Sequence, residues 1–515
     1  MKRQPLISQG SLSRLLKAAT ESFDRSDYQQ CIEILERANR LAPAHPGVLL
    51  DLGRVQGMCY DYAAAERYFE KAVLVTPQKT NALAMAGVYC RGFGRYDMAK
   101  DYFERAAQEP NASPDTFVKL AELYERLRFL DEAAKAVDRA LQLDPACVLA
   151  LLVRARLNRL TGKLEEAEKL VRSFLGRTDP NTWSTRIRGW YELGAILDRQ
   201  GRYEEAMTAF LEAKTLIRPN APQLIVAQRS VHALLKEAET SITAEVLQRW
   251  FDAGKTFQPP LQLTVLCGHP RSGTTLLEQV LDSHPEIISA EETSIFFETY
   301  LSLKRAFPKD ARMSSVLESA SPNALQAARK NYFHAMESLL DSRIGDRLLI
   351  DKNPSLTSLV PAVGRVFPEA KFLMTLRDPR DVCLSAFMQP LPLNQVSAIF
   401  LSLEDTTTEY ASLMSFWRTL APRLKNPYIE VRYEDMVDDL ESASRRVLGF
   451  LGKPWDARIL HFDEHARQKL VRSPTYTEVT KPVFKGAVGR WRNYQKYLEP
   501  HLEKLAPFVA AFGYE

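Results

Sequence analysis

The sequence predicts two parts of different fold class: an all-α solenoid of helical hairpins over residues 12–218, and an α/β domain with a mainly parallel sheet over residues 257–515. Two observations predict this division. In the first part, small and large apolar residues recur at a constant step of about 34 residues. In the second part, a short apolar segment precedes a glycine-bearing loop and a helical pattern. A chain of 515 residues is also too long for one compact core.

The repeat is clearest at two positions of the second helix of each hairpin. The small position is occupied by Ala65, Ala99, Ala133 and Ala167. The large apolar position is occupied by Leu35, Phe69, Phe103, Val137 and Val171. Small residues allow paired helices to approach closely, and the pattern resembles the tetratricopeptide repeat, with about six units. The resemblance implies a superhelix whose concave face holds a peptide or partner protein; a scaffold or oligomerisation arm is the alternative.

The last unit has the fullest signature of this repeat. It contains Trp190, Leu193, Gly194, Tyr203, Ala206, Phe210 and Ala213. Ala206 follows Ala167 at a longer step than the one that separates the earlier alanines, which predicts an insertion around residues 177–185. Residues 219–256 continue in a helical pattern and are expected to cap the solenoid and link it to the second part. Pro259 and Pro260 then break the chain, which places the boundary near residue 257.

Composition restricts the function. Hydrophobic residues at 45% and charged residues at 26% are typical of a globular protein. The net charge of +4 is far from the basic stripe of a nucleic-acid-binding protein, so no nucleic-acid partner is expected. The six cysteines stand singly, which predicts neither a zinc site nor a disulfide framework, and no metal is expected.

The location is predicted from three further features. The first residues are basic but no apolar stretch follows them, unlike a secretion signal. The uncharged run at residues 382–403 contains Pro390 and Pro392, which argue against a membrane span. Together with the isolated cysteines, these features predict a cytoplasmic protein.

The second part begins with a predicted phosphate-binding loop. Residues 261–267 form an apolar, β-branched segment, and GHPRSGTT separates it from the helical pattern LLEQVLDSH. Gly268 and Gly273 permit close backbone approach, and the first amides of the helix point toward a bound anion. Thr274 stands where a nucleotide P-loop has its lysine, which argues against ATP or GTP. Arg271 supplies a cation instead, although a purely structural turn is the alternative.

The segment PRSGTTLLEQVLDSHPEI resembles the sulfotransferase superfamily. The protein-tyrosine sulfotransferases are the more similar branch, since the cytosolic small-molecule enzymes carry lysine at position 271. The resemblance covers residues 257–515 and implies a P-loop-like domain that uses 3′-phosphoadenosine 5′-phosphosulfate, PAPS, as donor. It assigns the 5′-phosphosulfate to the loop residues Arg271, Ser272, Gly273, Thr274 and Thr275.

The resemblance also implies a site for the 3′-phosphate of the donor. In KFLMTLRDPRDVCLSAF, Arg377 ends a predicted strand and Ser385 lies on the segment that follows it. An arginine at the carboxyl end of a parallel strand is well placed to bind a ligand. A surface ion pair between Arg377 and Asp378 is the alternative reading of these residues.

Two later segments complete the nucleotide site that the resemblance implies. Tyr433, in IEVRYEDMV, takes the position of a tyrosine near the nucleotide, after a further predicted strand. Arg490 precedes Trp491 and takes the position of a basic residue that meets the 3′-phosphate. The sequence departs from the family in the outer contacts of the donor, with Gln389 where the family has arginine and Gly489 where it often has serine. The hydroxyl of Thr475 is a further candidate contact.

Sulfuryl transfer needs orientation, stabilisation of charge and a base for the acceptor hydroxyl. By resemblance, SAEETSIFF provides Glu292 as the base, with Ala290 in place of the family glycine. The alternative is that Glu291 and Glu292 are acidic residues in the first turn of a helix. His284 is the second candidate base, but it precedes a proline and fits a turn.

Charge stabilisation is assigned to Lys352 and Arg271. In RLLIDKNPSL a predicted strand at residues 347–350 precedes Lys352, and the resemblance places this lysine beside the transferring group. Asp351 and Asn353 differ from the family pattern, and a lysine with a buried stem and solvated amine is the alternative.

The sequence thus predicts a PAPS-dependent sulfotransferase that acts on a hydroxyl group. A protein tyrosine is one candidate acceptor, and a carbohydrate or small-molecule hydroxyl is another. An adaptor with an inactive nucleotide domain and an NTP-dependent kinase are the alternatives from other classes.

Overall fold

The computed structural model describes residues 9–176, 183–308, 310–468, 483 and 485–515. The chain forms two compact units, Met1–Thr185 and Arg186–Glu515. Within the described residues, no helix combines the length and the apolar character that a membrane span requires.

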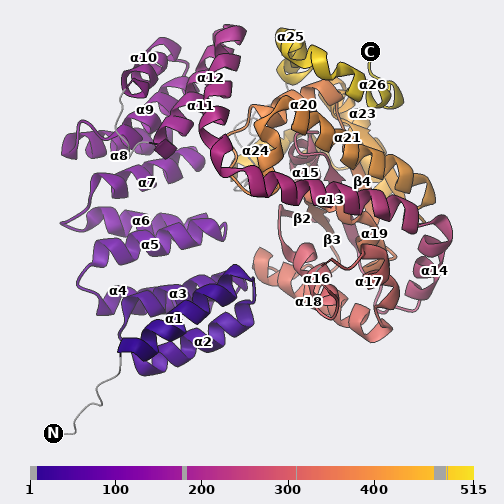
Figure 1. Ribbon diagram of the computed structural model, residues 1–515, viewed down its shortest axis with the longest axis horizontal. Helices are drawn as coiled ribbons and strands as arrows, with labels where there is room; N and C mark the ends of the chain where they lie inside the picture. Colours follow the sequence, from indigo (N-terminus) through magenta and orange to yellow (C-terminus); the bar gives the residue numbers. More distant parts are fainter. Residues whose placement is uncertain (1–8, 177–182, 309, 469–482, 484) are drawn as a thin grey trace. The chain divides into compact units, whose positions relative to one another are not determined.

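The first unit is built from successive pairs of helices (Figure 1). These helices are α1 (Gln9–Asp24), α2 (Tyr28–Leu41), α3 (Pro46–Met58), α4 (Tyr62–Val75), α5 (Lys79–Gly92), α6 (Tyr96–Gln108), α7 (Pro114–Arg126), α8 (Leu130–Leu143), α9 (Val148–Leu160) and α10 (Leu164–Leu175). Several begin at a side-chain cap, as where Asp61 and Ser113 accept the backbone amides of Ala64 and Thr116.

The predicted repeat period is confirmed by the packing. The alanines of the small position are buried, and so are the large residues that recur with them. A Cβ added to Gly53 or Gly87 would lie 2.4 or 2.7 Å from the ring of Phe69 or Phe103. Helix pairs therefore touch closely where the repeat places its small residues.

The last repeat-like hairpin packs within the second unit. It consists of α11 (Trp183–Arg199) and α12 (Tyr203–Ile217), and α13 (Pro222–Ser241) and α14 (Ala244–Gly254) follow it. The boundary between the two compact units thus lies one hairpin before the end of the repeat pattern. The predicted domain boundaries at residues 218 and 257 stay predictions. Most of the predicted insertion, residues 177–182, lies outside the described residues.

A five-stranded parallel sheet of order β2-β3-β1-β4-β5 forms the centre of the second unit. Its strands are β1 (Leu263–Gly268), β2 (Ile287–Glu291), β3 (Leu348–Lys352), β4 (Lys371–Leu376) and β5 (Tyr428–Arg432). The strands predicted around residues 261–267, 347–350 and 371–376 and in IEVRYEDMV correspond to β1, β3, β4 and β5. The sequence pattern did not predict β2, which pairs with β3 at one edge of the sheet as described.

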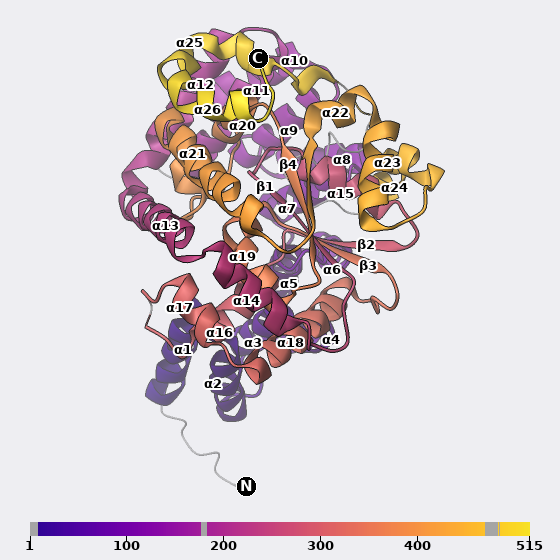
Figure 2. The same ribbon diagram turned by 90° about the vertical axis from the view of Figure 1, so that its right-hand side faces the viewer.

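Helices lie on both sides of this sheet (Figure 2). On one face, Leu266 and Ile350 pack with residues of α15 (Thr274–Asp282) and α23 (Leu440–Leu451) in one buried cluster. The other helices are α16 (Ile295–Lys304), α17 (Met313–Ser319), α18 (Pro322–Leu340), α19 (Val360–Val366), α20 (Pro379–Phe387), α21 (Leu403–Leu420), α22 (Tyr433–Asp438), α24 (Phe462–Gln468), α25 (Gln495–Leu498) and α26 (Leu502–Ala511).

Candidate functional site

A predicted site residue stands at or just beyond the carboxyl end of every strand. They are Arg271 after β1, Glu292 after β2, Lys352 at the end of β3, Arg377 after β4 and Tyr433 after β5. Because all strands are parallel, these ends share one edge of the sheet. Ligands of open α/β sheets bind at that edge.

The loop between β1 and α15 is shaped for close approach. Gly273 has a φ of 100°, and a Cβ at this position would lie 2.7 Å from the Tyr433 ring. Arg271 also has a positive φ, 77°, which is uncommon for a residue with a side chain. Thr274 and Thr275 form the first turn of α15, whose amides and helix dipole favour an anion.

Arg271 and the residues of the predicted 3′-phosphate site contact one another. The Arg271 Nε–H donates to Ser385 Oγ at 3.0 Å, and Arg377 Nη1 donates to the Arg271 carbonyl at 3.2 Å. The Arg377 guanidinium carbon lies 4.9 Å from the centroid of the Tyr433 ring. The structure therefore brings Arg271, Gly273, Arg377, Ser385 and Tyr433 into one cluster.

Arg377 is not paired with its neighbour Asp378. The Asp378 carboxylate binds the Arg380 guanidinium through both oxygens. Among the described residues, the carboxylate nearest to Arg377 is that of Asp381, at 3.9 Å. The side chain of Arg377 is only 8% exposed, and its buried Nε has no hydrogen-bond acceptor among the described residues. A buried cation with an unsatisfied donor fits an anion ligand.

Ser272 is oriented toward the protein. Its hydroxyl oxygen lies 2.7 Å from Thr375 Oγ1, and its amide donates to the His269 carbonyl at 3.1 Å. In this conformation the polar groups of Ser272 hold the loop against β4.

Lys352 lies among three carboxylates and is fully buried. Its Nζ is 2.9 Å from Glu292 Oε1, 3.1 Å from Glu291 Oε1 and 3.6 Å from Glu278 Oε2. Burial by itself lowers the pKa of Lys352, but the three carboxylates outweigh it and raise the pKa above its ordinary value. Lys352 is therefore a fixed cation, and the alternative of a solvated amine is wrong.

Of these three carboxylates, Glu292 faces solvent most. Its side chain is 38% exposed, against 6% for Glu291 and none for Glu278. Its backbone has a φ of 49°, and its amide donates to the Lys352 carbonyl. Glu291 ends β2 and α16 begins only at Ile295, so the alternative that both glutamates open a helix is wrong.

The neighbours of Lys352 have structural contacts. Asp351 accepts a hydrogen bond from the buried Tyr332 hydroxyl at 2.8 Å, and burial raises the pKa of Asp351 to about 7. Asn353 accepts the amide of Ser355 and donates to the Thr293 carbonyl. These contacts account for two residues that depart from the family pattern.

His284 occupies a turn, as the sequence predicted. Its Nδ1 accepts the amide of Glu286, which leaves Nε2 as the donor to the Pro454 carbonyl at 3.0 Å. Both ring nitrogens are thus used within the fold.

Arg490 begins the short helix η8 (Arg490–Tyr494), next to the cluster around Arg377. The amides of Gly489 and Trp491 donate to the two oxygens of Asp381, and Arg377 Nη2 donates to the Ala487 carbonyl. Gly489 has a φ of 69°, a conformation that suits glycine better than the serine of the family. Thr475 lies outside the described residues.

Comparison with known proteins adds to this geometry. Residues 264–457 match the model of the sulfotransferase family, and residues 118–181 and 187–220 match two models of the tetratricopeptide repeat. The chain joins tetratricopeptide repeats to a sulfotransferase-family domain.

Two curated relatives are similar at low identity. An uncharacterized protein of Aquifex aeolicus is 23% identical over 417 residues, which cover 79% of this chain and 52% of that protein. Protein-tyrosine sulfotransferase 1 of Danio rerio is 25% identical over 296 residues, which cover 56% of this chain and 79% of that protein. The match thus spans about half the length of the Aquifex relative.

A solved sulfotransferase domain, from the olefin synthase of Synechococcus PCC 7002, is 23% identical. The match covers 50% of this chain and 97% of that domain, with a TM-score of 0.36. At so low a score, the fold assignment rests on the parallel sheet and the family matches instead.

Three residues that contact the candidate site residues were not predicted from the sequence. Glu278 contacts Lys352, Asp381 holds the backbone before and after Arg490, and Asp198 of α11 pairs with Arg490. Glu278 had a local signal, since it is a charged residue within the apolar stretch TTLLEQVLD. Asp198 had none, because it lies in the repeat pattern.

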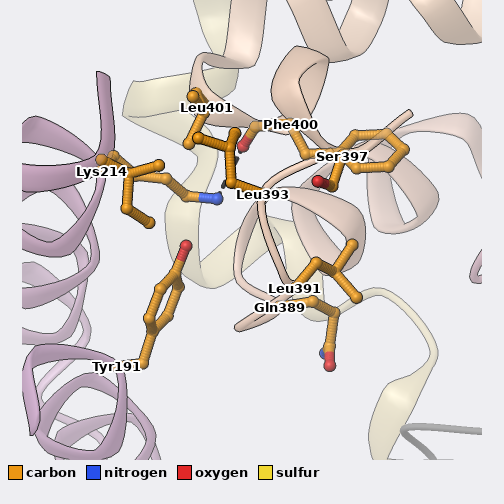
Figure 3. A pocket seen from close by; sticks show the side chains of 9 residues that line it. Tyr191, Lys214, Gln389, Leu391, Leu393, Ser397, Phe400 and Leu401 are labelled. Carbon is orange, nitrogen blue, oxygen red and sulfur yellow. Dashed lines mark hydrogen bonds between the residues drawn. The ribbon is translucent and has the colours of Figure 1, made fainter. Parts of the chain in front are cut away.

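A small recess lies between α12 and the segment after α20. Figure 3 shows Lys214 and Tyr191 pointing toward one another there, with Leu391, Leu393 and Phe400 opposite them. The Lys214 amine donates to the Phe400 carbonyl at 2.6 Å. Burial, aided by the charge of Arg218, lowers the pKa of Lys214 to about 7.

This shift predicts a pH-dependent stability. Above pH 7 the folded protein releases a proton from Lys214 that the unfolded chain keeps until about pH 10, so the free energy of unfolding rises with pH. Between pH 7.5 and 9.5, wild type should gain about 1 kcal/mol per pH unit relative to Lys214→Met. Urea unfolding at several pH values measures this difference. The exposed Lys330→Met is the control, and parallel profiles for wild type and Lys214→Met would contradict the prediction.

Proposed function

We propose that this protein is a PAPS-dependent sulfotransferase acting on a hydroxyl group. The sulfotransferase-family domain and the protein-tyrosine sulfotransferase relatives support a sulfotransferase. The observation that carries the donor assignment is the contact between the partly buried Arg271 and the buried Arg377, whose Nε–H has no acceptor among the described residues. Such a cluster suits a ligand that bears both a 5′-phosphosulfate and a 3′-phosphate.

In the proposed reaction, PAPS supplies the sulfuryl group and an anionic 5′-phosphate leaving group. The amides of the first turn of α15 and the Arg271 guanidinium bind the phosphosulfate and stabilise its negative charge. Lys352, a fixed cation at the end of β3, stabilises the charge that develops on the migrating group. Arg377, Ser385, Tyr433 and Arg490 hold the 3′-phosphate and the nucleoside.

Glu292 is the proposed base. The acceptor oxygen forms a bond to sulfur as the bond from sulfur to the 5′-phosphate oxygen breaks, and the acceptor proton moves to the Glu292 carboxylate. The exposure of this carboxylate supports the assignment, because Glu291 and Glu278, the other two carboxylates beside Lys352, are too deeply buried to meet an acceptor.

The acceptor that we propose to test first is a tyrosine in a protein. Relatives bearing the name protein-tyrosine sulfotransferase support this choice, as does the capacity of repeat arrays to bind peptides. Tyrosine-containing peptides, a carbohydrate and a phenol, each incubated with ³⁵S-labelled PAPS, separate the acceptor classes. Absence of transfer to every class would favour the adaptor hypothesis.

The donor is tested by thermal stabilisation. The product nucleotide 3′-phosphoadenosine 5′-phosphate, PAP, should raise the melting temperature, since a ligand that binds only the folded state stabilises it. ATP with Mg²⁺ should not, because Thr274 stands where a nucleotide P-loop has lysine. Stabilisation by ATP and not by PAP would overturn the donor and favour a kinase.

Glu292→Gln is predicted to lower the turnover number by about 10²–10⁴-fold and leave the affinity for PAP unchanged. The amide cannot take the acceptor proton, whereas the nucleotide contacts lie on other residues. Steady-state transfer and calorimetric binding of PAP measure the two quantities. Glu298→Gln, on α16, is the matched control, and full turnover in Glu292→Gln would exclude Glu292 as the base.

A further inference from the structure

The last repeat-like hairpin contacts the proposed 3′-phosphate site. Asp198, near the end of α11, forms an ion pair with Arg490, and its Oδ2 lies 2.7 Å from Arg490 Nη2. Its other oxygen, Oδ1, accepts from the Tyr494 hydroxyl at 2.6 Å. Both oxygens of one carboxylate are therefore bound by residues of η8, which lies far from α11 in the sequence.

The surrounding contacts hold this carboxylate in place. Tyr494 is fully buried, and its ring packs edge-on against Tyr203 of α12 with centroids 5.4 Å apart. Lys496 forms an ion pair with Glu204, also on α12. Since a ring contact, a hydrogen bond and two ion pairs join the hairpin to residues 490–496, Asp198 and Arg490 stay together when the chain is folded.

Arg490 remains partly exposed to solvent in this pair. The Arg490 side chain is 33% exposed, against 16% for Asp198, so the arginine is the member of the pair that faces solvent more. Asp198 thus restricts the rotamers of a long side chain before a ligand arrives, which lowers the entropy lost on binding.

On its other side, the loop before Arg490 is anchored to the nucleotide cluster. Asp381 of α20 binds the amides of Gly489 and Trp491, and Arg377 donates to Ala487. The backbone of Arg490 is therefore positioned by α20, while its side chain is positioned by α11.

We propose that Asp198 is a positioning residue, which holds Arg490 in place to bind the 3′-phosphate. The last repeat-like hairpin then contributes to the nucleotide site. This inference rests on the proposed use of PAPS. It assigns the hairpin a role in donor recognition in addition to any binding of peptides by the repeats.

The test compares two nucleotides that differ only in the 3′-phosphate. Calorimetry with PAP and with AMP gives an affinity ratio that reports the contribution of this group. Asp198→Asn is expected to lower the ratio about tenfold, because the amide keeps the shape but loses the charged partner of Arg490. The affinity for AMP should stay the same, which a general loss of folding would not permit.

Four further variants complete the experiment. Arg490→Ala should lower the ratio as well, and adding Asp198→Asn to it should have no further effect, since the two residues act through one contact. Asp198→Glu should give an affinity ratio between those of the wild type and Asp198→Asn. Glu204→Gln removes the neighbouring ion pair with Lys496 and should leave the ratio unchanged.

The possible results separate the two proposals. A wild-type protein that binds PAP and AMP equally would overturn the proposed donor, and the role of Asp198 with it. A wild-type preference for PAP that Asp198→Asn leaves intact would overturn the role of Asp198 alone. Tighter binding of PAP by Asp198→Asn would also overturn it, because Asp198 would then compete with the phosphate for Arg490.

Discussion

Lys352→Met is expected to abolish sulfuryl transfer and to lower the free energy of unfolding by about 3–5 kcal/mol. The buried Lys352 amine lies beside the carboxylates of Glu278, Glu291 and Glu292 and attracts all three, whereas methionine has a similar length but no charge. Without the lysine, the buried carboxylates of Glu278 and Glu291 lose their neighbouring cation, and little water can solvate them. Urea unfolding and transfer of ³⁵S from labelled PAPS measure the two losses.

A second variant separates stability from chemistry. Glu278 is fully buried beside Lys352, so the double variant Lys352→Met with Glu278→Gln should recover part of the stability. It should remain inactive, since the cation beside the migrating group is still absent. The exposed Lys330→Met is the control for both measurements. Normal transfer by a folded Lys352→Met protein would exclude the catalytic role of this lysine.

The second large effect is expected for Arg271→Ala, which should weaken the binding of PAP about 100-fold or more. Arg271 lies in the loop after β1, and its Nε–H is oriented by the hydroxyl of Ser385. A charge-assisted contact between guanidinium and phosphate is lost in alanine, and the loop GHPRSGTT contains no other arginine or lysine. Calorimetric titration with PAP measures the change, and transfer activity should fall with it.

The controls for Arg271 address charge and folding. Arg445→Ala removes an exposed arginine that pairs with Glu441 on α23, and it should bind PAP like the wild type. Arg271→Lys should give intermediate affinity, because lysine keeps the charge but not the planar pair of donors. Unchanged affinity in Arg271→Ala would show that the phosphate-binding loop has been wrongly assigned.

Local sequence patterns predicted much of this fold. The constant step between the alanines predicted the hairpins, because each unit repeats the same contacts between neighbouring helices. The segment from 261 to 282 predicted a strand, a loop and a helix, because its apolar pattern changes at the two glycines. The edge strand β2 was not predicted, because its sequence IISAE contains only two β-branched apolar residues and ends in a glutamate.

The candidate site was predicted less completely. Resemblance supplied Arg377, Ser385 and Tyr433, and the structure places them against the loop that carries Arg271. It could not supply Asp198, which lies in the repeat pattern, far along the sequence from its partner Arg490. No sequence pattern predicts an ion pair of this kind, because each of the two residues by itself is typical of an ordinary exposed helix or loop.

The sequence by itself thus determined the class of each part and the order of strand, loop and helix around Arg271, because periodicity, turns and helix starts depend on neighbours along the chain. Only the tertiary structure decided which carboxylate among Glu278, Glu291 and Glu292 faces solvent, and that the last repeat-like hairpin contacts Arg490. The order of the strands and the packing of α11 bring these residues together, and that order depends on burial across the whole unit rather than on any single segment.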